Sequence, residues 1–486
     1  MQERSAFLEP GRNCWRVERT NRAAFIVDAA AYFRLALRAM IRAKHQIIII
    51  GWDLDTRITL DDEAHPSGAP TTLGPLLTWL AKRTPDLRIH ILIWDEGLLK
   101  APWRGTTIFR LGRWKLSEQI NLKWDSTHPL DASHHQKILV IDDNTAFCGG
   151  IDITADRWDT RHHKDEEPGR KRPFTRRVYD PWHDATMAVD EDAAVALGGL
   201  ARSRWKAATG QDLPAPPRNG DAWPEGLKPA FENIEIGIAR TMGTVGDIKE
   251  VREIEKLFVA MIEAAERVVY VETQYFASRL VAEAIAKRLE EPDGPEFVIV
   301  NPRKAYGWLD EAVMSPARYE LVQSLAAKDK YGRFRIYTPV TECGADIYVH
   351  AKLMFVDDRF MRVGSANMNN RSMGLDSECD LMIDGTGDPA AGAKIVEIRT
   401  DMVAEHLGKE PEEVAACFAR EKSLIACIEA LRGSGRTLLP FEPEEPPKIE
   451  RKIARTEILD PEGAGALFER RVRPGLLSRL GRGRGR

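Results

Sequence analysis

The sequence predicts an α/β protein made of two similar halves, and three observations support this. Its 486 residues are too many for one ordinary hydrophobic core. Helical patterns alternate with short β-branched runs that are apolar on both faces, as in strands covered by helices on both sides. Segments of the first half also recur in the same order in the second half, with changes only in loop length.

The internal repeat predicts which elements of the two halves correspond. Each half is expected to contain a helix, a strand, a second helix, a second strand and then a strand that carries a polar motif, so that the whole has pseudo-twofold symmetry. The aligned segments are Arg19–Thr20 with Arg240–Thr241, Ala39–Ile41 with Ala260–Ile262, Ile47–Ile50 with Val268–Val271, and the pattern from Leu80 with that from Ile285.

Composition divides the chain into two halves, a linker and an extension. Residues 1–212 form the first half and residues 230–440 the second, whereas the segment 213–229 has five prolines and no periodicity, which indicates a linker. A periodic stretch that begins at Pro411 predicts one amphipathic helix at the end of the second half. Residues 441–486 form an extension whose last part is a basic tail with seven arginines.

Two strings of the sequence share one spacing of polar residues. HQKILVIDD begins at His135, and HAKLMFVDD begins at His350. Since alternate residues of a strand face the same side, Lys137 shares a face with His135, and Lys352 shares one with His350. An imidazole beside an ammonium group suits a phosphate, because the lysine holds anionic oxygens while the histidine attacks or transfers a proton. Two halves related by twofold symmetry would place two such pairs around one phosphorus.

The residues after each motif supply further candidates. GGID, from Gly149 to Asp152, corresponds to GSAN, from Gly364 to Asn367. Glycine lets a backbone approach a ligand closely, and the hydroxyl of Ser365 and the amide of Asn367 can donate to phosphate oxygens. Asp152 stands where the other half has an amide, and an ionised carboxylate there would repel a phosphate. We therefore expect Asp152 to bond to neighbouring backbone or lysine.

Four carboxylates complete the catalytic set. Asp142 and Asp357 end the two motifs, and we expect them to hold the motif loop rather than to touch the phosphorus. Alignment of HDATMAVD with ECDLMID places Asp184 on Glu378. Each of these two residues is a candidate acceptor for the second N–H of a motif histidine, a contact that would fix the tautomer and raise basicity.

The complete pattern resembles the signature of the phospholipase D superfamily. That signature, HxKxxxxDxxxxxxG(G/S)x(N/D), is present twice, as HQKILVIDDNTAFCGGID and HAKLMFVDDRFMRVGSAN. RWDT from Arg157, PWHD from Pro181 and VETQYF from Val271 are further similar to the lipid-hydrolysing branch. The resemblance covers residues 19–384, and it implies a two-lobed α/β/α sandwich with one active site between the lobes and with no metal or cofactor.

By this resemblance, the reaction passes through a covalent phosphohistidine. One histidine attacks the phosphorus and the other protonates the leaving alcohol, after which water or a second alcohol reverses the step. We assign His135 as the nucleophile and His350 as the acid, although the symmetry of the halves leaves the reverse order open. Lys137, Lys352 and Asn367 would stabilise the charge that develops on the equatorial oxygens.

Several other residues are weaker candidates for the cleft wall. Glu272, Gln274 and Tyr275 are expected at a strand end that faces the cleft, where Gln274 is a candidate substrate contact. Trp52 and Asp53 occupy nearly the matching place in the first half. For these residues, a role in the cleft wall and simple packing both stay open.

One loop of the first half, RHHKDEEPGRKRPFTRR from Arg161, has no counterpart of similar length in the second half. It contains the adjacent His162 and His163 among many charges, and we interpret both as solvated loop residues rather than metal ligands. Long loops beside active sites often act as lids or select substrates, and we expect such a role here.

Charge and hydropathy restrict the partners and the location. The net charge of -4 gives no general electrostatic case for a nucleic-acid partner. A signal-peptide core and a run of about 18 apolar residues are both missing, so a cytoplasmic protein is expected, although export without such a signal stays open. The basic tail is either solvated or contacts anionic lipid, which would make the protein peripheral to a membrane. Because one chain holds both motifs, we expect a monomer with a complete active site.

Three classes of function stay open. The first, favoured by PWHD and VETQYF, is a phospholipase D that hydrolyses or transfers phospholipid headgroups at a membrane surface. The second is a nuclease-type phosphodiesterase of nucleic acid, although only KRPFTRR suggests a basic groove. The third is a lipid-binding or partner-binding module, which would not need both histidine–lysine pairs. A cardiolipin synthase-like phosphatidyltransferase is a further member of the family to consider, but its usual N-terminal membrane helices are not evident in this sequence.

Overall fold

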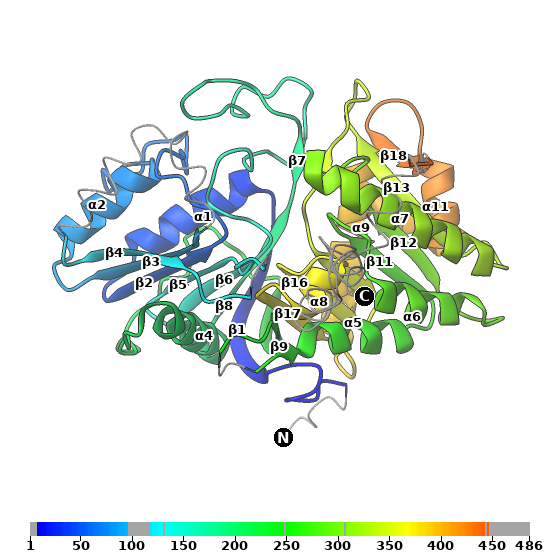
Figure 1. Cartoon of the computed structure of the whole chain (residues 1–486). Coiled ribbons are helices and arrows are strands. Elements are labelled where there is room, and N and C mark those ends of the chain that lie inside the picture. Colours follow the sequence, from blue (N-terminus) through cyan, green and yellow to red (C-terminus); the bar gives the residue numbers. More distant parts are fainter. Residues whose placement is uncertain are drawn as a thin grey trace, which may run out of the picture.

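One large mixed sheet runs through both halves of the protein (Figure 1). The computed structural model describes residues 7–95, 114, 117–129, 132–246, 249–305, 308–442 and 445–446. In the first half, the strands of this sheet are β1 (Arg16–Val27), β2 (Gln46–Gly51), β3 (Arg88–Trp94), β4 (Ile120–Asp125), β5 (Ile138–Ile141), β6 (Thr145–Gly149) and β8 (Ala185–Asp190). The helices of this half are α1 (Ala29–Ile41), α2 (Leu73–Arg83) and α4 (Glu191–Thr209).

The second half contains the corresponding elements and several additions. Its strands are β9 (Phe231–Met242), β10 (Val251–Arg252), β11 (Val268–Glu272), β12 (Glu296–Val300), β13 (Phe334–Val340), β15 (Leu353–Val356), β16 (Phe360–Gly364), β17 (Glu378–Asp384) and β18 (Thr437–Pro440). Its helices are α5 (Glu253–Glu263), α6 (Arg279–Leu289), α7 (Trp308–Lys328), α8 (Asn370–Gly374), α9 (Pro389–Leu407), α10 (Pro411–Glu421) and α11 (Leu424–Leu431). A separate small sheet pairs β7 (Trp182–His183) with β14 (Tyr348–Val349), one strand from each half.

The strand order confirms the internal repeat. From one edge the order is β4, β3, β2, β5, β6, β8 and β1, and it continues with β9, β17, β16, β15, β11, β12, β13 and β18. Outward from the central β1–β9 pair, corresponding strands of the two halves follow in the same order. β1 and β9 are antiparallel, with Arg16 opposite Ile238 and Ala23 opposite Phe231, so the pseudo-twofold axis passes between these two strands.

Helices cover both faces of the sheet, which confirms the predicted α/β/α layering. α1 and α2 pack on one face of the first half, and α5, α6 and α7 pack on the second half. α4, α9, α10 and α11 share a core on the opposite face that continues across the halves. In β2, Ile48 and Ile50 enter this shared core, whereas Ile47 and Ile49 enter the other, which explains a run of four isoleucines. No helix within the described ranges is both long and apolar enough to span a bilayer.

The end of the second half differs from the prediction of a single helix. Lys422 adopts a left-handed backbone with φ of +57°, and this ends α10. The side chain of Ser423 then accepts a hydrogen bond from the Ala426 N–H and begins α11. The chain from Pro411 therefore forms two helices, and the prediction of one was wrong.

The alignment of Arg19–Thr20 with Arg240–Thr241 was also wrong. β8 pairs Ala185 with Val27, whereas the equivalent strand β17 pairs Cys379 with Arg240. Since the repeat makes Ala185 equivalent to Cys379, the structural counterpart of Arg240 is Val27. The two identical letters in each half are therefore a coincidence.

Asp142 and Asp357 each hold the start of a neighbouring strand. The Asp142 carboxylate accepts the backbone N–H groups of Lys44, His45 and Gln46, and the Asp357 carboxylate accepts those of Glu266, Arg267 and Val268, at distances of 2.6 to 2.8 Å. At about 3.3 Å per residue, each aspartate lies about 20 Å along the chain from its motif histidine. Both residues are therefore structural, and their grouping with the catalytic residues was wrong.

We predict that Asp357→Ala destabilises the protein by about 3 kcal/mol, because it leaves three backbone N–H groups, among them the buried one of Val268, without their acceptor. The neighbouring Asp358 provides a matched control, since its half-exposed side chain pairs only with the exposed Arg267. Asp358→Ala should change stability by about 0.5 kcal/mol or less. Urea unfolding followed by circular dichroism measures both values, and equal midpoints for the two variants would contradict the assignment.

Candidate active site

The two motif histidines lie where the halves meet, just before equivalent strands. His135 precedes β5, and His350 precedes β15. The backbone N–H of His135 donates to the carbonyl of Ser377 at 3.0 Å, and that of His350 donates to the carbonyl of His183 at 2.7 Å. Each histidine is thus anchored to the half that does not carry it, which brings both imidazoles into one site.

Each imidazole is oriented by a carboxylate from the opposite half. His135 Nδ1 lies 3.0 Å from both carboxylate oxygens of Glu378, and His350 Nδ1 lies 2.6 Å from Asp184 Oδ2. Because Nδ1 donates its hydrogen to the carboxylate, the lone pair of each ring is on Nε2. Across the described residues, no group bonds to either Nε2 atom. Both Nε2 atoms are therefore available for chemistry.

Ser365 holds the carboxylate of Glu378 in place and does not face the cleft. Its hydroxyl donates to Glu378 Oε2 at 2.5 Å and accepts the Cys379 N–H at 3.0 Å. Ser372 donates to the other oxygen of Glu378 at 2.8 Å. Since Ser365 is fully buried, its predicted contact with phosphate was wrong, and its role is to position Glu378.

The glycines that follow the motifs make room for neighbouring strands. A Cβ on Gly149 would lie 2.5 Å from Thr186 Cα, and one on Gly364 would meet the backbone of β17. A Cβ on Gly150 would lie 2.1 Å from Asp184 Oδ1, where the carboxylate that orients His350 sits. These glycines therefore allow close packing around the site, and the predicted approach to a ligand does not explain them.

Lys137 has an ionic partner. Its Nζ lies 3.3 Å from Asp152 Oδ2 and donates to the carbonyl of His135 at 2.9 Å. The other oxygen of Asp152 accepts the backbone N–H of Trp52 at 2.9 Å. The expected contacts of Asp152 with lysine and backbone are thus present. They engage both carboxylate oxygens, so we do not assign Asp152 a contact with the substrate.

Lys352 has a neutral partner instead. Its Nζ donates to the carbonyl of His350 and lies 3.3 Å from Gln274 Oε1. The same oxygen accepts the amide of Asn367 at 3.5 Å. Gln274 and Asn367 therefore lie beside the lysine, in the place predicted for them. Burial lowers the pKa of Lys352 to about 7; the charge of Asp184 opposes this effect, but none of the described residues forms a direct ion pair with the lysine.

Burial and the lysines keep both imidazoles neutral. The pKa of His135 lies well below its ordinary value because burial disfavours the cation and because Lys137 and Lys352 repel it. The pKa of His350 is well below its ordinary value for the same reasons, with Lys352 as the larger charge. Burial also raises the pKa of Asp184 to about 6. The lysine of each half acts on the imidazole of the other, as expected of one shared site.

We predict that the fall of kcat/KM with rising pH, which begins where free His350 loses its proton, becomes steeper above about pH 7. Lys352 carries its charge below its pKa, so the free enzyme loses this cation, and with it attraction for a phosphate, as the pH passes that value. A bound phosphodiester favours the charged amine, so the corresponding fall in kcat should occur at higher pH. Profiles of kcat/KM and kcat from pH 5 to 10 measure both limbs. An alkaline limb that is unchanged in the residual activity of Lys352→Met would contradict this assignment.

The three further motifs converge on His350. The ring of Trp182 lies 5.0 Å from that of His350 and stacks on Tyr348 at 4.6 Å. The guanidinium of Arg157 lies 4.3 Å from the centre of the Trp182 ring. The Gln274 amide donates to the Tyr348 hydroxyl at 2.9 Å. Aromatic side chains from both halves therefore pack beside His350.

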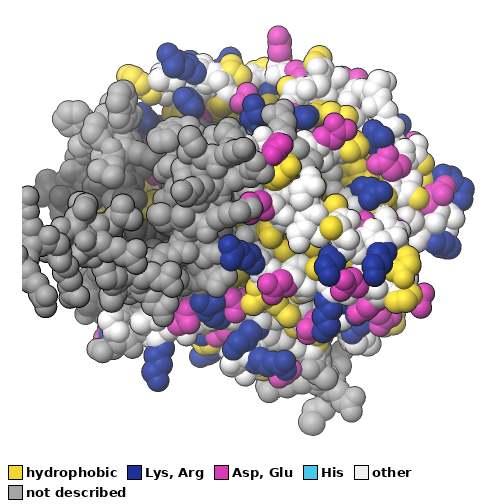
Figure 2. Space-filling model, turned by 45° about the vertical axis from the view of Figure 1, so that its right-hand side comes forward, with side chains coloured by type: hydrophobic (Ala, Val, Ile, Leu, Met, Phe, Trp, Pro, Cys, Tyr) yellow, Lys and Arg dark blue, Asp and Glu magenta, His cyan; other side chains and the backbone are white. Residues whose placement is uncertain are grey.

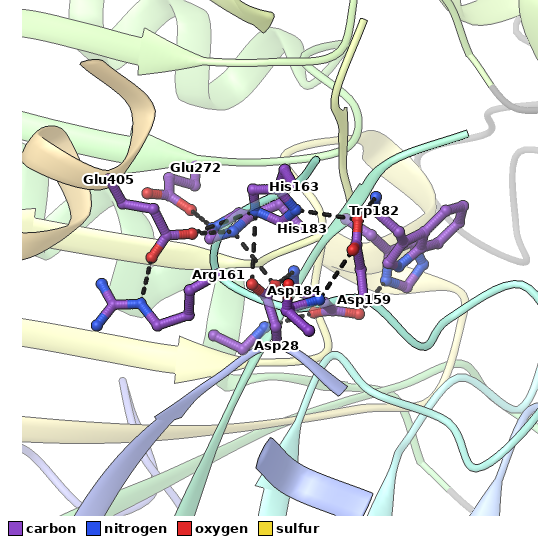
Figure 3. A network of polar contacts seen from close by, with 12 residues as sticks. Asp28, Asp159, Arg161, His163, Trp182, His183, Asp184, Glu272 and Glu405 are labelled. Carbon is purple, nitrogen blue, oxygen red and sulfur yellow. Dashed lines mark hydrogen bonds and ion pairs between the residues drawn. The ribbon is translucent and has the colours of Figure 1, made fainter. Parts of the chain in front are cut away.

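A second polar network (Figure 3) adjoins His350, whose backbone N–H donates to the carbonyl of His183 in that network, and it corrects two predictions. His163 is fully buried rather than solvated, and it bonds to Asp159 at 3.1 Å and to Glu405 at 3.2 Å. Glu272 does not face the cleft either, because it is buried and accepts His183 Nε2 at 2.7 Å. The PWHD and VETQYF strings pointed to His183 and Glu272, but no feature of the sequence pointed to His163 or Glu405.

Parts of this network are arranged so that they could hold a metal ion. The ligand atoms of Asp28, His163, His183 and Glu405 all lie within 4.8 Å of one another, and so do those of His183, Glu272 and His406. All of these residues are buried.

Comparisons with known proteins agree with the repeat and with the motifs. Residues 39–218 match a family model described as phospholipase D, and residues 258–398 match one described as cardiolipin synthase, PLD-like domain. Phospholipase D alpha 1 of Oryza sativa subsp. japonica is 24% identical over 535 residues, which cover 80% of this chain and 64% of the relative. Phospholipase D A of Dictyostelium discoideum is 27% identical over 471 residues, which cover 79% of this chain and 35% of the relative. The chain therefore spans less than two thirds of the length of these relatives.

A solved structure has a similar fold. Phosphatidylserine synthase of Haemophilus influenzae aligns with a TM-score of 0.53 at 16% identity, over 84% of this chain and 96% of that one. At this identity the likeness concerns the fold alone. Matching domains in both halves and the doubled motif lead to one conclusion: the chain belongs to the phospholipase D superfamily.

Proposed function

We propose that this chain is a phospholipase D that hydrolyses phospholipid headgroups, or transfers the phosphatidyl group to a second alcohol, through a covalent phosphohistidine. One observation carries the proposal. Two neutral imidazoles, each oriented by a carboxylate of the other half, present free Nε2 atoms in one site that also contains two lysines. A protein that only binds lipid has no use for two oriented imidazoles.

The first step forms a bond between His135 Nε2 and phosphorus and breaks the bond from phosphorus to the headgroup oxygen. We assign His135 as the nucleophile because its side chain is 15% exposed, against 5% for His350. His350 Nε2 gives a proton to the leaving oxygen. In the second step His350 takes a proton from water or from an alcohol, whose oxygen displaces His135 from phosphorus.

His350 must carry a proton in the first step although its pKa is low in the free enzyme. A bound phosphodiester adds a negative charge beside the imidazole, which raises the pKa of this group in the complex. Asp184 favours the same change, since its carboxylate stabilises the imidazolium at 2.6 Å. Lys137 and Lys352 stabilise the phosphoryl oxygens as their charge increases.

The choice of phospholipid over nucleic acid rests on the names of the relatives and on surface charge. The similar curated proteins are named phospholipase D. Where Figure 2 shows described residues, basic and acidic side chains lie interspersed. Among the described residues of that face, no continuous basic track for a nucleic-acid backbone is visible.

Headgroup release tests this proposal. Vesicles that contain phosphatidylcholine, phosphatidylethanolamine and phosphatidylglycerol are incubated with the full chain, and water-soluble headgroups are measured by mass spectrometry. Added ethanol should yield phosphatidylethanol if the phosphatidyl group is transferred. His135→Asn is the matched control and should release nothing. Cleavage of single-stranded DNA without any headgroup release would overturn the lipid proposal in favour of a nuclease.

The site needs only one chain, since both histidines and both carboxylates come from it, and we propose that the monomer is active. The predicted contact of the basic tail with anionic lipid concerns residues that lie outside the described ranges. We keep a peripheral contact with the membrane surface, and a cytoplasmic location, as proposals. Gel filtration and vesicle co-sedimentation test them.

A further inference from the structure

Behind the active site, four buried side chains from both halves converge on one point (Figure 3). Asp28 follows β1, His163 lies in the long loop, His183 ends β7 and Glu405 lies in α9. None of the four is assigned a step in the reaction above. The chemistry of two imidazoles and two carboxylates in a closed pocket is that of a site for a divalent cation.

The spacing of the ligand atoms fits a tetrahedral ion. Glu405 Oε1 lies 3.1 Å from His183 Nδ1 and 3.2 Å from His163 Nε2. Asp28 contributes two oxygens, with Oδ2 3.4 Å from His163 Nε2 and Oδ1 3.4 Å from His183 Nδ1. Zinc bonds of about 2.0 to 2.1 Å in tetrahedral geometry require ligand atoms about 3.3 Å apart. We propose that Asp28, His163, His183 and Glu405 bind a structural zinc ion.

Two buried atoms of this group lack a hydrogen bond. Asp28 Oδ2 and His183 Nδ1 make none within the described part of the chain. His183 Nδ1 has two carboxylate oxygens within 3.4 Å, so distance is not the reason. A buried polar atom that lies this close to acceptors without bonding to them needs another partner, and an ion among the three residues would supply one.

The outer contacts are those that zinc-binding histidines make. His163 uses its other nitrogen, Nδ1, to contact Asp159 at 3.1 Å. His183 uses Nε2 to contact Glu272 at 2.7 Å. A carboxylate behind each histidine fixes the ring and raises its basicity toward a metal. Arg161 occupies the second oxygen of Glu405 at 2.5 Å, and Oε1 faces the two histidines, with Arg436 Nη2 farther away at 3.7 Å.

The alternative to a metal ion is a pair of protonated histidines, and the experiment must distinguish the two. His163 and His183 each meet carboxylates at both ring nitrogens, so without a metal both rings would have to be imidazolium. One divalent ion between neutral rings supplies the same charge as two protons.

A neighbouring cavity gives an ion access to the site, and contacts of the ligand residues link the site to the catalytic residues. A cavity of about 680 Å³ adjoins it, lined in part by Asp28, Arg161, His162 and Glu405. The Asp28 carboxylate accepts the backbone N–H of Asp184 at 3.0 Å, and the carbonyl of His183 accepts that of His350. The ion would therefore tie the two halves together and position His350 and Asp184, without contact with the reacting phosphorus.

The decisive measurement is the metal content of the full, untagged chain purified without chelator. We expect about one zinc ion per chain by plasma mass spectrometry, lost in His163→Gln and retained in the control His162→Gln, whose side chain is exposed. Zinc should raise the Tm of metal-free wild-type protein and leave that of His163→Gln unchanged. Asp159→Asn should bind zinc about 10- to 100-fold more weakly, because it removes the carboxylate behind His163.

If His163→Gln fails to fold, cobalt binding by the wild-type protein still tests the proposal. Titration of Co²⁺ into metal-free wild-type protein should give the strong visible absorption of a tetrahedral site at one equivalent. Wild-type protein that contains no metal and binds neither Co²⁺ nor Zn²⁺ would overturn the proposal in favour of two imidazolium ions. Equal zinc content in wild-type and His163→Gln protein would also overturn it. These readouts do not depend on lipid hydrolysis, so they stand apart from the proposed function.

Discussion

His350→Asn should lose turnover of phospholipid by about 10⁴-fold, yet still form a covalent bond to phosphorus when the leaving group needs no proton. The reason is that the two imidazoles have different roles in the reaction. His135 attacks with its free Nε2, whereas His350 supplies the proton to a poor leaving group and then activates water. An aryl phosphodiester such as p-nitrophenyl phosphocholine releases a stable phenolate. The variant should therefore release nitrophenolate in a burst and stop with phosphocholine on His135.

The reciprocal variant provides the control. His135→Asn should show neither turnover nor a burst, because no nucleophile remains. Mass spectrometry of the digested protein locates the modification on one histidine. A burst in His135→Asn together with none in His350→Asn would show that the roles are reversed, which the symmetry of the halves permits. Modification of neither residue in either variant would contradict a covalent mechanism.

The parts of the fold that depend on local pattern could be predicted from the sequence. Ile47–Ile50 predicts a strand because four β-branched residues in a row suit a position between two helical layers, and β2 has both neighbours. The spacing of His135 and Lys137 predicts a shared face because a strand alternates with a period of two. Order along the chain also sufficed to match Asp184 with Glu378, since the repeat conserves strand position.

Contacts between distant residues could not be predicted in this way. The repeat says that each half has one carboxylate, but only the packing of the halves decides that Glu378 serves His135 and that Asp184 serves His350. His163 was misjudged for the same reason. Its neighbours in sequence are charged, which suggests solvent, but Glu405 from α9 covers it. A buried histidine in a charged loop carries no local signature.

The second large effect concerns the two carboxylates, each of which orients the histidine of the other half. We expect substitution of Asp184 to reduce activity more than substitution of Glu378. Asp184→Asn should reduce kcat by about 10²- to 10⁴-fold. Asp184 Oδ1 accepts the Ala185 N–H at 2.8 Å, and Oδ2 faces His350. In the variant, the single oxygen of the amide stays with the backbone N–H, so its NH₂ group faces Nδ1. This favours the tautomer with hydrogen on Nε2, and it also removes the charge that stabilises the imidazolium.

Glu378→Gln should have a smaller effect, because its other partners are hydroxyl groups. Ser365 and Ser372 each bond to one oxygen of Glu378, and a hydroxyl can either donate or accept. The amide can therefore turn its oxygen to His135 Nδ1 while a serine accepts from its NH₂ group, which preserves the reactive tautomer. Burst and steady-state rates at pH 6.5 measure both variants, with the exposed Asp180→Asn as a control that should resemble wild type. If Asp184→Asn stays within tenfold of wild type, or if Glu378→Gln is the more damaged of the two, the carboxylates do not act by fixing tautomers.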